Sequence, residues 1–471
     1  MPNSTVSPLT QLSDAQLQRA LLKDRKFLEK TQLPIVTVAA TFKEDLKGLH
    51  HLEELDTIPD VVFSRAHYSM ALGVAISAWK GAINPQKAWI VDPTNYVANE
   101  DWKSIKFTEV VGKTIARYPL LKTLKDLVDR FGRQKLPILS NITAPLAYLT
   151  KKVKQPMLSL HIAAGNLLVE QGHQVIQVVT DPHVREDYLK HAANPKLSYC
   201  VFDQKTRTEL LEKANTLGKV ESINELENRV VVTGPPVDPR IIAARSFKYP
   251  WQANRPLRLC LTTGGLGTNS AEIELILRQL MGELAQPDSK LQVMVYASTH
   301  EFIAQLVTDL AMQFGIALTT LAPSDPGAFE IGETLEKPRR YQVKTPLTLL
   351  YHPQIVDANE LLISHAFPWA DGFITKPSGD MAYDAAASGS FLLTLTEWGD
   401  WEHNVRETFE QLNISRRADS EHISLQLRAL MEKPKNGVSW ITQAMENAHM
   451  IDDLFLRGAD KILAEYVRRN K

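Results

Sequence analysis

The segment FITKPSGDMAYDAAASGSFLLTLTEWGDWEHN, residues 373–404, alternates short apolar runs with polar turns that contain glycine. The runs FIT and FLLTLT predict buried strands, and the small residues of MAYDAAASG between them predict a helix. Two strands joined by a helix run parallel, so both end at the same edge of their sheet. The polar residues directly after each strand are therefore expected to share one ligand-binding edge.

The same alternation of strand-like and helical segments continues through the chain. Runs such as LSYCVF at 197–202 and LQVMVYAS at 291–298 are largely apolar, which is typical of a parallel sheet covered by helices on both faces. A chain of 471 residues exceeds what one hydrophobic core usually supports, and a proline-containing segment at 246–256 separates two such series. We therefore expect an α/β protein with two Rossmann-like, doubly wound domains that face a cleft.

The predicted divisions are an N-terminal extension at 1–58, a first Rossmann-like domain at 59–245, a second Rossmann-like domain at 256–435 and a C-terminal helix at 436–471. The extension contains a polar helix that begins near Ser13 with capping-box spacing. From Trp440 onward, apolar residues recur at helical spacing, which predicts one long amphipathic helix.

The composition excludes several classes of protein. A formal net charge of −1 argues against general nucleic-acid binding, which normally requires a basic excess. Cys200 and Cys260 lie in apolar runs, as expected of buried thiols in a reducing compartment. The N-terminus has no secretory pattern, and no uncharged run reaches the roughly 18 residues of a membrane span. These features predict a soluble, cytoplasmic protein.

A first candidate phosphate loop is TTGGLGTN, which connects a predicted strand to a helix. Its glycines would allow the backbone to approach a phosphate, and the helix dipole would favour the negative charge. The candidate residues are Gly264, Gly265, Gly267 and Asn269. A tight turn without a ligand explains the same residues.

The second candidate loop follows the strand that ends at Thr375. Lys376 can contact a phosphate, and the backbone amides of Ser378, Gly379 and Asp380 precede a helix. Asp384, one turn inside that helix, can accept hydrogen bonds from two ribose hydroxyls. An acidic residue that complements the helix dipole is the alternative reading of Asp384.

Two further groups of polar residues follow predicted strands. Glu402, His403 and Asn404 can bind sugar hydroxyls, or they form a solvated turn. His67 lies at a strand-to-helix junction, where a neutral imidazole could accept a proton, or where it has a purely structural role.

A local excess of positive charge occurs at 111–154, which contains ten basic residues and two acidic ones. Apolar residues are interleaved with these charges. The segment is therefore predicted to contact anionic lipid as a peripheral membrane surface, or to form a solvated helix face.

The order of these motifs resembles that of GT-B glycosyltransferases of the family 28 type. This group includes plant monogalactosyldiacylglycerol synthase, bacterial diglucosyldiacylglycerol synthases and the lipid-linked N-acetylglucosaminyltransferase of peptidoglycan synthesis. The resemblance covers about residues 59–417, and TGGLG, TKPSGDMAYDAAASG and EWGDWEHN carry it. The chain differs at Asp384, where glutamate is usual, and at His403, which alone separates Glu402 from Asn404. The loop before His67 also lacks the usual glycines.

The resemblance implies that the second domain binds a nucleotide-sugar, usually a UDP-sugar, as a co-substrate without a resident cofactor or metal. It implies transfer of a hexose with inversion to a lipid or lipid-linked acceptor at the inner face of the cell membrane. His67 would be the catalytic base, and the last helix would cross back to the first domain. Two alternatives remain, a nucleotide-sugar 2-epimerase and a non-catalytic relative that binds nucleotide or lipid.

Overall fold

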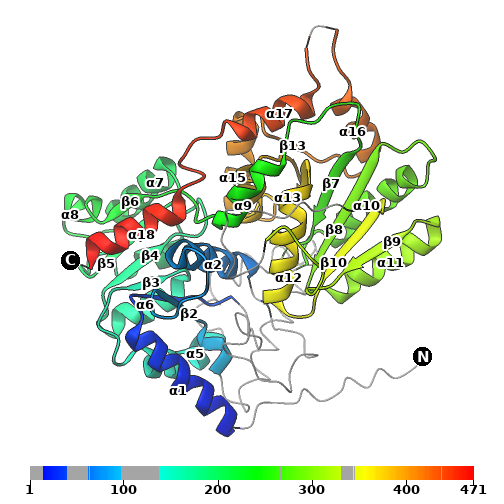
Figure 1. The fold of residues 1–471 in the computed structure, drawn as a ribbon. Coiled ribbons are helices and arrows are strands. Elements are labelled where there is room, and N and C mark those ends of the chain that lie inside the picture. The colour runs from blue at the N-terminus through cyan, green and yellow to red at the C-terminus, as the bar shows by residue number, and fades with distance from the viewer. Residues whose placement is uncertain are drawn as a thin grey trace.

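The computed structural model describes residues 14–39, 62, 64–96, 137–264, 267–329, 343, 345–435 and 437–470. These residues form two all-parallel sheets of six and seven strands, each flanked by helices (Figure 1). The fold class expected from the sequence, two doubly wound α/β units, is therefore confirmed.

The strands of the first sheet are arranged in the order β2-β1-β3-β4-β5-β6. Their bounds are β1 Leu33–Val36, β2 Ala88–Val91, β3 Met157–Ser159, β4 Val175–Val178, β5 Leu197–Val201 and β6 Val230–Val232. Its helices are α1 Asp14–Lys30, α2 Arg65–Trp79, η1 Pro93–Tyr96, α5 Pro137–Thr150, α6 Ile162–Glu170, η5 Glu186–Leu189, α7 Gln204–Thr216 and α8 Ile223–Glu227. Successive strand residues face opposite cores, so Val175 packs with the outer helices and Ile176 faces the second domain.

The second sheet has the order β13-β12-β11-β7-β8-β10-β9. Its strands are β7 Leu257–Thr262, β8 Leu291–Ser298, β9 Leu318–Leu321, β10 Leu347–Tyr351, β11 Gly372–Thr375, β12 Phe391–Thr394 and β13 Ser415–Arg417. Its helices are α10 Ser270–Leu284, α11 Glu301–Phe314, α12 Ile355–Leu361, the π-helix η7 Leu362–Ala366, α13 Phe367–Trp369, α14 Met381–Ala387, α15 Asp400–Gln411 and α16 Ile423–Met431. The connection between the domains contains α9 Pro239–Ala243 and η6 Ala244–Phe247.

The described part of the predicted N-terminal extension, residues 14–39, belongs to the first domain. Strand β1 lies inside the first sheet, where Ile35 pairs with both Ile90 of β2 and Leu158 of β3. Helix α1 also packs on this domain, since Leu28 is fully buried. The helix is polar overall and buries only a narrow stripe, so its composition resembled that of an exposed element.

The C-terminal segment returns to the first domain, but as two helices rather than the single one predicted. Helix α17, Trp440–His449, packs on the second sheet, and α18, Gly458–Arg469, packs against α2 of the first (Figure 1). A Cβ on Gly458 would lie 2.0 Å from Pro235 O, and one on Gly234 would lie 1.8 Å from Leu454 O. The crossing chain therefore presses so closely on residues 234–235 that glycine is required on both sides.

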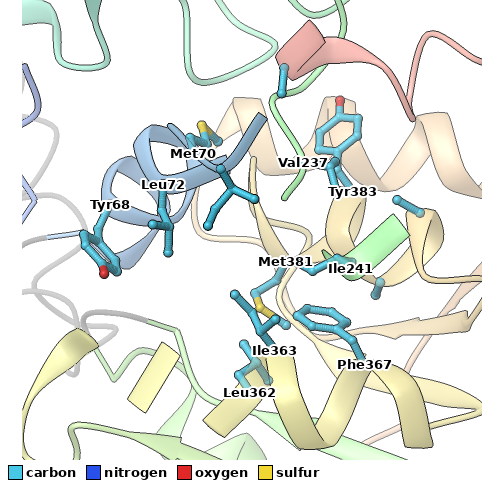
Figure 2. Packing of buried hydrophobic residues seen from close by; sticks show 14 of the residues in the cluster. Tyr68, Met70, Leu72, Val237, Ile241, Leu362, Ile363, Phe367, Met381 and Tyr383 are labelled. Atoms are coloured by element: carbon cyan, nitrogen blue, oxygen red, sulfur yellow. The ribbon is translucent and has the colours of Figure 1, made fainter. Parts of the chain in front are cut away.

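One apolar core joins the two domains. It includes Tyr68 of α2, Val237 near α9 and Tyr383 of α14, and Figure 2 shows Tyr68 and Tyr383 on opposite sides of this core. The Phe202 and Tyr383 rings, one from each domain, lie edge to face with centroids 5.5 Å apart. The domains are therefore held by continuous side-chain packing as well as by the connecting chain.

Within the described residues, no helix is long and apolar enough to span a membrane. The basic segment at 111–154 lies mostly outside those residues, and only its last part, from α5 onward, is described.

Replacing Tyr466 by Phe is expected to lower the free energy of unfolding by about 1–2 kcal/mol. The buried Tyr466 hydroxyl lies 2.7 Å from Gln32 O and 2.9 Å from Pro156 O, so it ties α18 to the first domain. Urea denaturation measures the loss. Val467→Ala, on the exposed face of the same helix, is the matched control and should change stability less. Equal effects of the two substitutions would contradict this role for the hydroxyl.

Candidate functional site

Both sheets place candidate residues at the point where the strand order reverses. In the first sheet this point lies between β1 and β3, and His67 on α2 follows β1. In the second sheet it lies between β7 and β11, which are followed by Gly264 and Lys376. Ligands of open parallel sheets bind beyond the carboxyl ends of strands at such switch points.

The loops after β7, β11 and β12 meet at the second switch point, as the sequence predicts. A Cβ on Gly264 would approach Lys376 Cδ to 3.2 Å, so a larger residue would displace the lysine. Lys376 Nζ forms an ion pair with Glu402 Oε1 at 2.7 Å. Glu402 Oε2 also accepts a hydrogen bond from Trp398 N at 2.6 Å. Lys376 and Glu402 are 7% and 3% exposed, so the lysine charge is neutralised inside the protein.

The remaining residues of the glycine loop shape the start of α10. Gly267 has φ +65° and Asn269 has φ +63°, so both adopt the left-handed conformation. The Asn269 side chain donates to Thr396 O at 3.0 Å and to Glu272 Oε2 at 2.6 Å. It therefore ties this loop to the one after β12. Gly265 lies outside the described residues.

The residues before α14 are bonded to one another. Thr375 Oγ1 accepts a hydrogen bond from Thr262 at 2.7 Å, which joins β11 to β7 at the switch point. Ser378 Oγ donates to Asp380 Oδ1 at 2.6 Å and accepts from Met381 N at 3.3 Å. The first amide of α14 is therefore already paired.

Arg65 of the first domain reaches into the second domain. Its guanidinium lies 2.6 Å from Asp380 Oδ2, donates to Asn359 Oδ1 at 2.6 Å and lies 3.6 Å from Asp384 Oδ2. Burial raises the pKa of Asp380, but the Arg65 charge, the Ser378 hydroxyl and backbone amides together outweigh burial and hold the pKa below its ordinary value. Asp380, expected near a phosphate, instead forms a buried ion pair between the domains.

Asp384 has a different charge state from Asp380. Burial raises the pKa of Asp384 to about 8, and the neighbouring Asp380 charge adds to the effect of burial. Arg65 opposes this shift, but it lies closer to Asp380. Asp384 is therefore mostly protonated at neutral pH, and a ribose could reach it only after Arg65 had moved.

His67 lies at the carboxyl edge of the first sheet. Its Nδ1 is 3.3 Å from Val38 O, and its Nε2 is 3.2 Å from Thr180 Oγ1. Because Nδ1 faces a carbonyl, it carries the proton, and the Nε2 lone pair accepts from the threonine hydroxyl. Burial lowers the pKa of His67, which keeps the ring neutral. The ring of His161, which follows β3, lies 5.1 Å away.

Glu402, His403 and Asn404, predicted to bind sugar hydroxyls or to form a solvated turn, belong to a helix. They lie in the first turn of α15, where successive side chains point about 100° apart. Glu402 turns inward, whereas His403 is half exposed and pairs with Glu407 at 3.0 Å. Consecutive side chains of a helix point in different directions, so the three residues are separated. The polar, turn-like sequence did not indicate this helix.

The edges of the two domains touch at this place. A Cβ on Gly379 would lie 2.7 Å from Thr180 O, so only glycine permits the contact. The Asn404 side chain donates to Pro182 O at 3.0 Å and accepts from Lys205 Nζ at 2.9 Å. Asn404 therefore bridges the domains. His67 is separated from Gly379 only by Thr180.

The sequence interpretation missed three residues that shape the site: Arg65, Thr180 and His300. His300 Nε2 lies 2.9 Å from Gly264 O and so fixes the glycine loop. Arg65 had a readable signal, since it stands where the resembling family has glycine and begins an otherwise largely apolar helix. Thr180 and His300 follow strands, but their partners are distant in sequence.

No group of three or more His, Cys, Asp or Glu side chains placed to hold a metal ion occurs in the part of the chain that the structure describes. Cys200 and Cys260 are buried free thiols, and burial raises the pKa of each well above its ordinary value. Neither thiol takes part in the site.

No protein-family model matches the sequence, and no curated protein sequence matches it. Among solved structures, the chain is similar to UDP-GlcNAc 2-epimerase from Neisseria meningitidis bound to UDP-GlcNAc, with 13% identity, a TM-score of 0.49 and coverage of 93% of this chain and 100% of that one. A UDP-forming α,α-trehalose-phosphate synthase from Burkholderia vietnamiensis has 13% identity, a TM-score of 0.49 and coverage of 93% and 99%. MurG from Acinetobacter baumannii has 13% identity, a TM-score of 0.45 and coverage of 93% and 99%.

These neighbours are GT-B glycosyltransferases and proteins of related fold, the group that the sequence motifs resemble. At such identities the likeness concerns the fold alone.

Asp384→Asn is expected to flatten the dependence of stability on pH. The folded protein keeps the Asp384 proton up to about pH 8, whereas the unfolded chain loses it near pH 4. Between these values the folded state holds one more proton, so the free energy of unfolding falls by about 1.4 kcal/mol per pH unit. Asparagine removes this contribution.

Urea unfolding at about pH 5.5 and pH 7.5 measures the slope for both proteins. The exposed Asp288→Asn is the matched control, because it removes a carboxylate outside the site. A slope in Asp384→Asn equal to that of the unsubstituted protein would show that the carboxyl is ionised in the folded state.

Proposed function

We propose that this protein is a glycosyltransferase that moves a hexose from a nucleotide-sugar, most simply a UDP-sugar, to an acceptor. One observation carries the proposal. The switch points of two parallel sheets face each other, with a glycine loop and a lysine on one side and a neutral histidine on the other. Such an arrangement suits a diphosphate in the second domain and a hydroxyl acceptor beside the first.

Lys376 and Gly264 are the proposed contacts of the diphosphate. The Glu402 carboxylate lies 2.7 Å from the lysine, in a position that an anionic ligand could take. A bound diphosphate would replace it and release Glu402 to accept hydrogen bonds from sugar hydroxyls. Lysine and backbone amides would then stabilise the leaving diphosphate without a metal ion.

His67 is the proposed base. Its Nε2 carries the lone pair, and its lowered pKa keeps that lone pair available at neutral pH. An acceptor hydroxyl that displaced the Thr180 hydroxyl would give its proton to Nε2 as its oxygen attacked the anomeric carbon. Attack opposite the leaving diphosphate would invert that carbon.

For the acceptor we propose a lipid or lipid-linked molecule at the inner face of a membrane. The support is the basic, apolar segment at 111–154 and the resemblance of the motifs to lipid glycosyltransferases. The protein would then be peripheral.

A non-catalytic nucleotide-binding role is the second candidate. It is favoured by the buried contacts of Arg65 with Asp384, the carboxylate expected at the ribose, and with Asp380, which was expected near a phosphate. Incubation with UDP-, GDP- and ADP-hexoses separates these readings. Transfer or donor hydrolysis supports the transferase, an epimerised nucleotide-sugar indicates a 2-epimerase, and saturable binding without any product indicates the non-catalytic role.

Lys376→Ala is expected to weaken UDP binding by about tenfold or more, because a charge-assisted contact is lost. Glu402→Gln should strengthen UDP binding, since it removes the carboxylate that competes for the lysine. Titration calorimetry measures both. Lys290→Ala is the matched control, because this exposed lysine precedes β8 at the opposite edge of the same sheet. Unchanged UDP affinity in Lys376→Ala would refute the diphosphate assignment.

His67→Gln is expected to lower kcat by about 10²- to 10⁴-fold, the usual contribution of general base catalysis. UDP affinity should stay unchanged, because the histidine belongs to the acceptor side. Steady-state kinetics with the donor found in the panel, together with UDP titration, tests both statements. A loss confined to UDP affinity would place His67 at the nucleotide instead.

A further inference from the structure

A pocket lies away from the switch points, where the connection between the domains meets the end of α17. It has a volume of about 530 Å³. We refer to it as the hinge pocket, and it is lined by Arg245, Ser246, Lys248, Tyr249, Pro250, Glu446, His449 and Met450. None of these residues belongs to the proposed nucleotide site.

The interior of the hinge pocket has a lysine whose hydrogen bonds are made to hydroxyl groups. Lys248 is 6% exposed, and its Nζ donates to Ser388 Oγ at 2.8 Å and to Ser390 Oγ at 2.6 Å. An ammonium group has three donors, so the two neutral hydroxyls leave one hydrogen without a partner in these contacts. The Phe373 ring, whose centroid lies 5.9 Å away, and the charge of Asp371 compensate the lysine charge only in part. Burying a charge in this way is unfavourable unless an anion accompanies it.

Two further groups in this pocket favour an anion. The Arg245 guanidinium donates to His449 O and Ala387 O, the carbonyls at the ends of α17 and α14, so no carboxylate balances its charge in these contacts. His449 Nε2 is buried and has no hydrogen-bond partner within the described residues. A Cβ on Gly389 would lie 2.9 Å from this nitrogen, so the glycine gives the ring its position. The imidazole nitrogen is therefore fixed in place and unsatisfied.

The rim of the hinge pocket is apolar and exposed. Tyr249 and Met450 are 77% and 72% exposed, among the highest values for large apolar side chains in the described residues. Pro250 adds a rigid face. Glu446 is the one carboxylate in the lining, which disfavours highly charged anions. A flat apolar body between Tyr249 and Met450 would bury area that is now in water.

We propose that the hinge pocket binds a small organic anion, a carboxylate or phosphate monoester on an aromatic body. Its acidic group contacts Lys248 and His449 Nε2, and its ring packs on Tyr249 and Met450. Because the pocket is formed by the interdomain connection and by the last helix before the chain crosses back, such a ligand stabilises the present arrangement of the domains.

The charges around Lys248 make this binding dependent on pH. Burial lowers the pKa of Lys248 to about 7, with Arg245 and Arg258 acting in the same direction and Asp371 and Cys260 opposing them. Asp371 is itself paired with Arg255 at 2.7 Å, and Glu446 and His449 face the pocket from α17. A bound anion favours the protonated lysine, so affinity is expected to fall as pH rises through about 7.

Titration of the full chain with phenyl phosphate, benzoate, inorganic phosphate and phenol tests the proposal. We expect saturable binding of phenyl phosphate or benzoate at least about tenfold tighter than that of inorganic phosphate or phenol, since charge and ring both contribute. The relative affinity of the two aromatic anions distinguishes a phosphate ligand from a carboxylate ligand. Absence of saturation by either one at about 20 mM overturns the proposal.

Variants locate the binding. Lys248→Met keeps the length of the side chain and should weaken both aromatic anions and inorganic phosphate by about tenfold. Tyr249→Ala alters an exposed residue, so folding is preserved, and it should weaken only the aromatic anions. Should Lys248→Met not fold, Tyr249→Ala and Met450→Ala decide the result, and unchanged affinity in both refutes the site.

The test is independent of the proposed nucleotide site. Binding of the aromatic anion should persist in the presence of UDP and in Lys376→Ala. Competition by UDP, or loss of binding in Lys376→Ala, would place the probe at the nucleotide site and overturn the hinge pocket.

Discussion

The shared apolar core between the two domains fixes the distance between their switch points. Tyr68, Phe202 and Tyr383 pack across the boundary, and the buried pair of Arg65 with Asp380 sets the register of the contact. A buried ion pair contributes little net stability because desolvation offsets its attraction, but removing one partner leaves an uncompensated charge. The pair therefore disfavours other docking arrangements of the domains, whereas the apolar contact supplies most of the attraction between them.

Because the domains are docked in this way, the charged groups of the site satisfy one another. Lys376 pairs with Glu402, and Arg65 pairs with Asp380. A nucleotide must therefore exchange with existing contacts rather than enter an empty cleft, and its affinity is reduced by the free energy of breaking them. The hinge pocket has the opposite character, since Lys248 donates its hydrogen bonds to the neutral hydroxyls of Ser388 and Ser390. One region of the molecule compensates its charge internally, and the other leaves a charge for a ligand.

Much of the fold was predictable because parallel strands covered on both faces leave continuous apolar runs. The strands at 291–298 and 372–375 could be located in this way, and so could the loops that follow them. The packing of the polar helix α1 on the first domain and the break between α17 and α18 could not be predicted. The first buries only a narrow stripe, and the second depends on close backbone contact at Gly234 and Gly458.

The sequence by itself determined that glycine, lysine and carboxylate residues would gather at one edge of the second sheet. Parallel strands all end at the same edge, and these residues directly follow the strand ends. Only the tertiary structure decided their partners. Arg65 and Asp380 are 315 residues apart, and their contact depends on how two finished domains pack. Local sequence records which groups follow a strand. Charge state and pairing arise from burial and from neighbours that no local pattern contains, and for that reason Asp380 is ionised while Asp384 is mostly protonated at neutral pH.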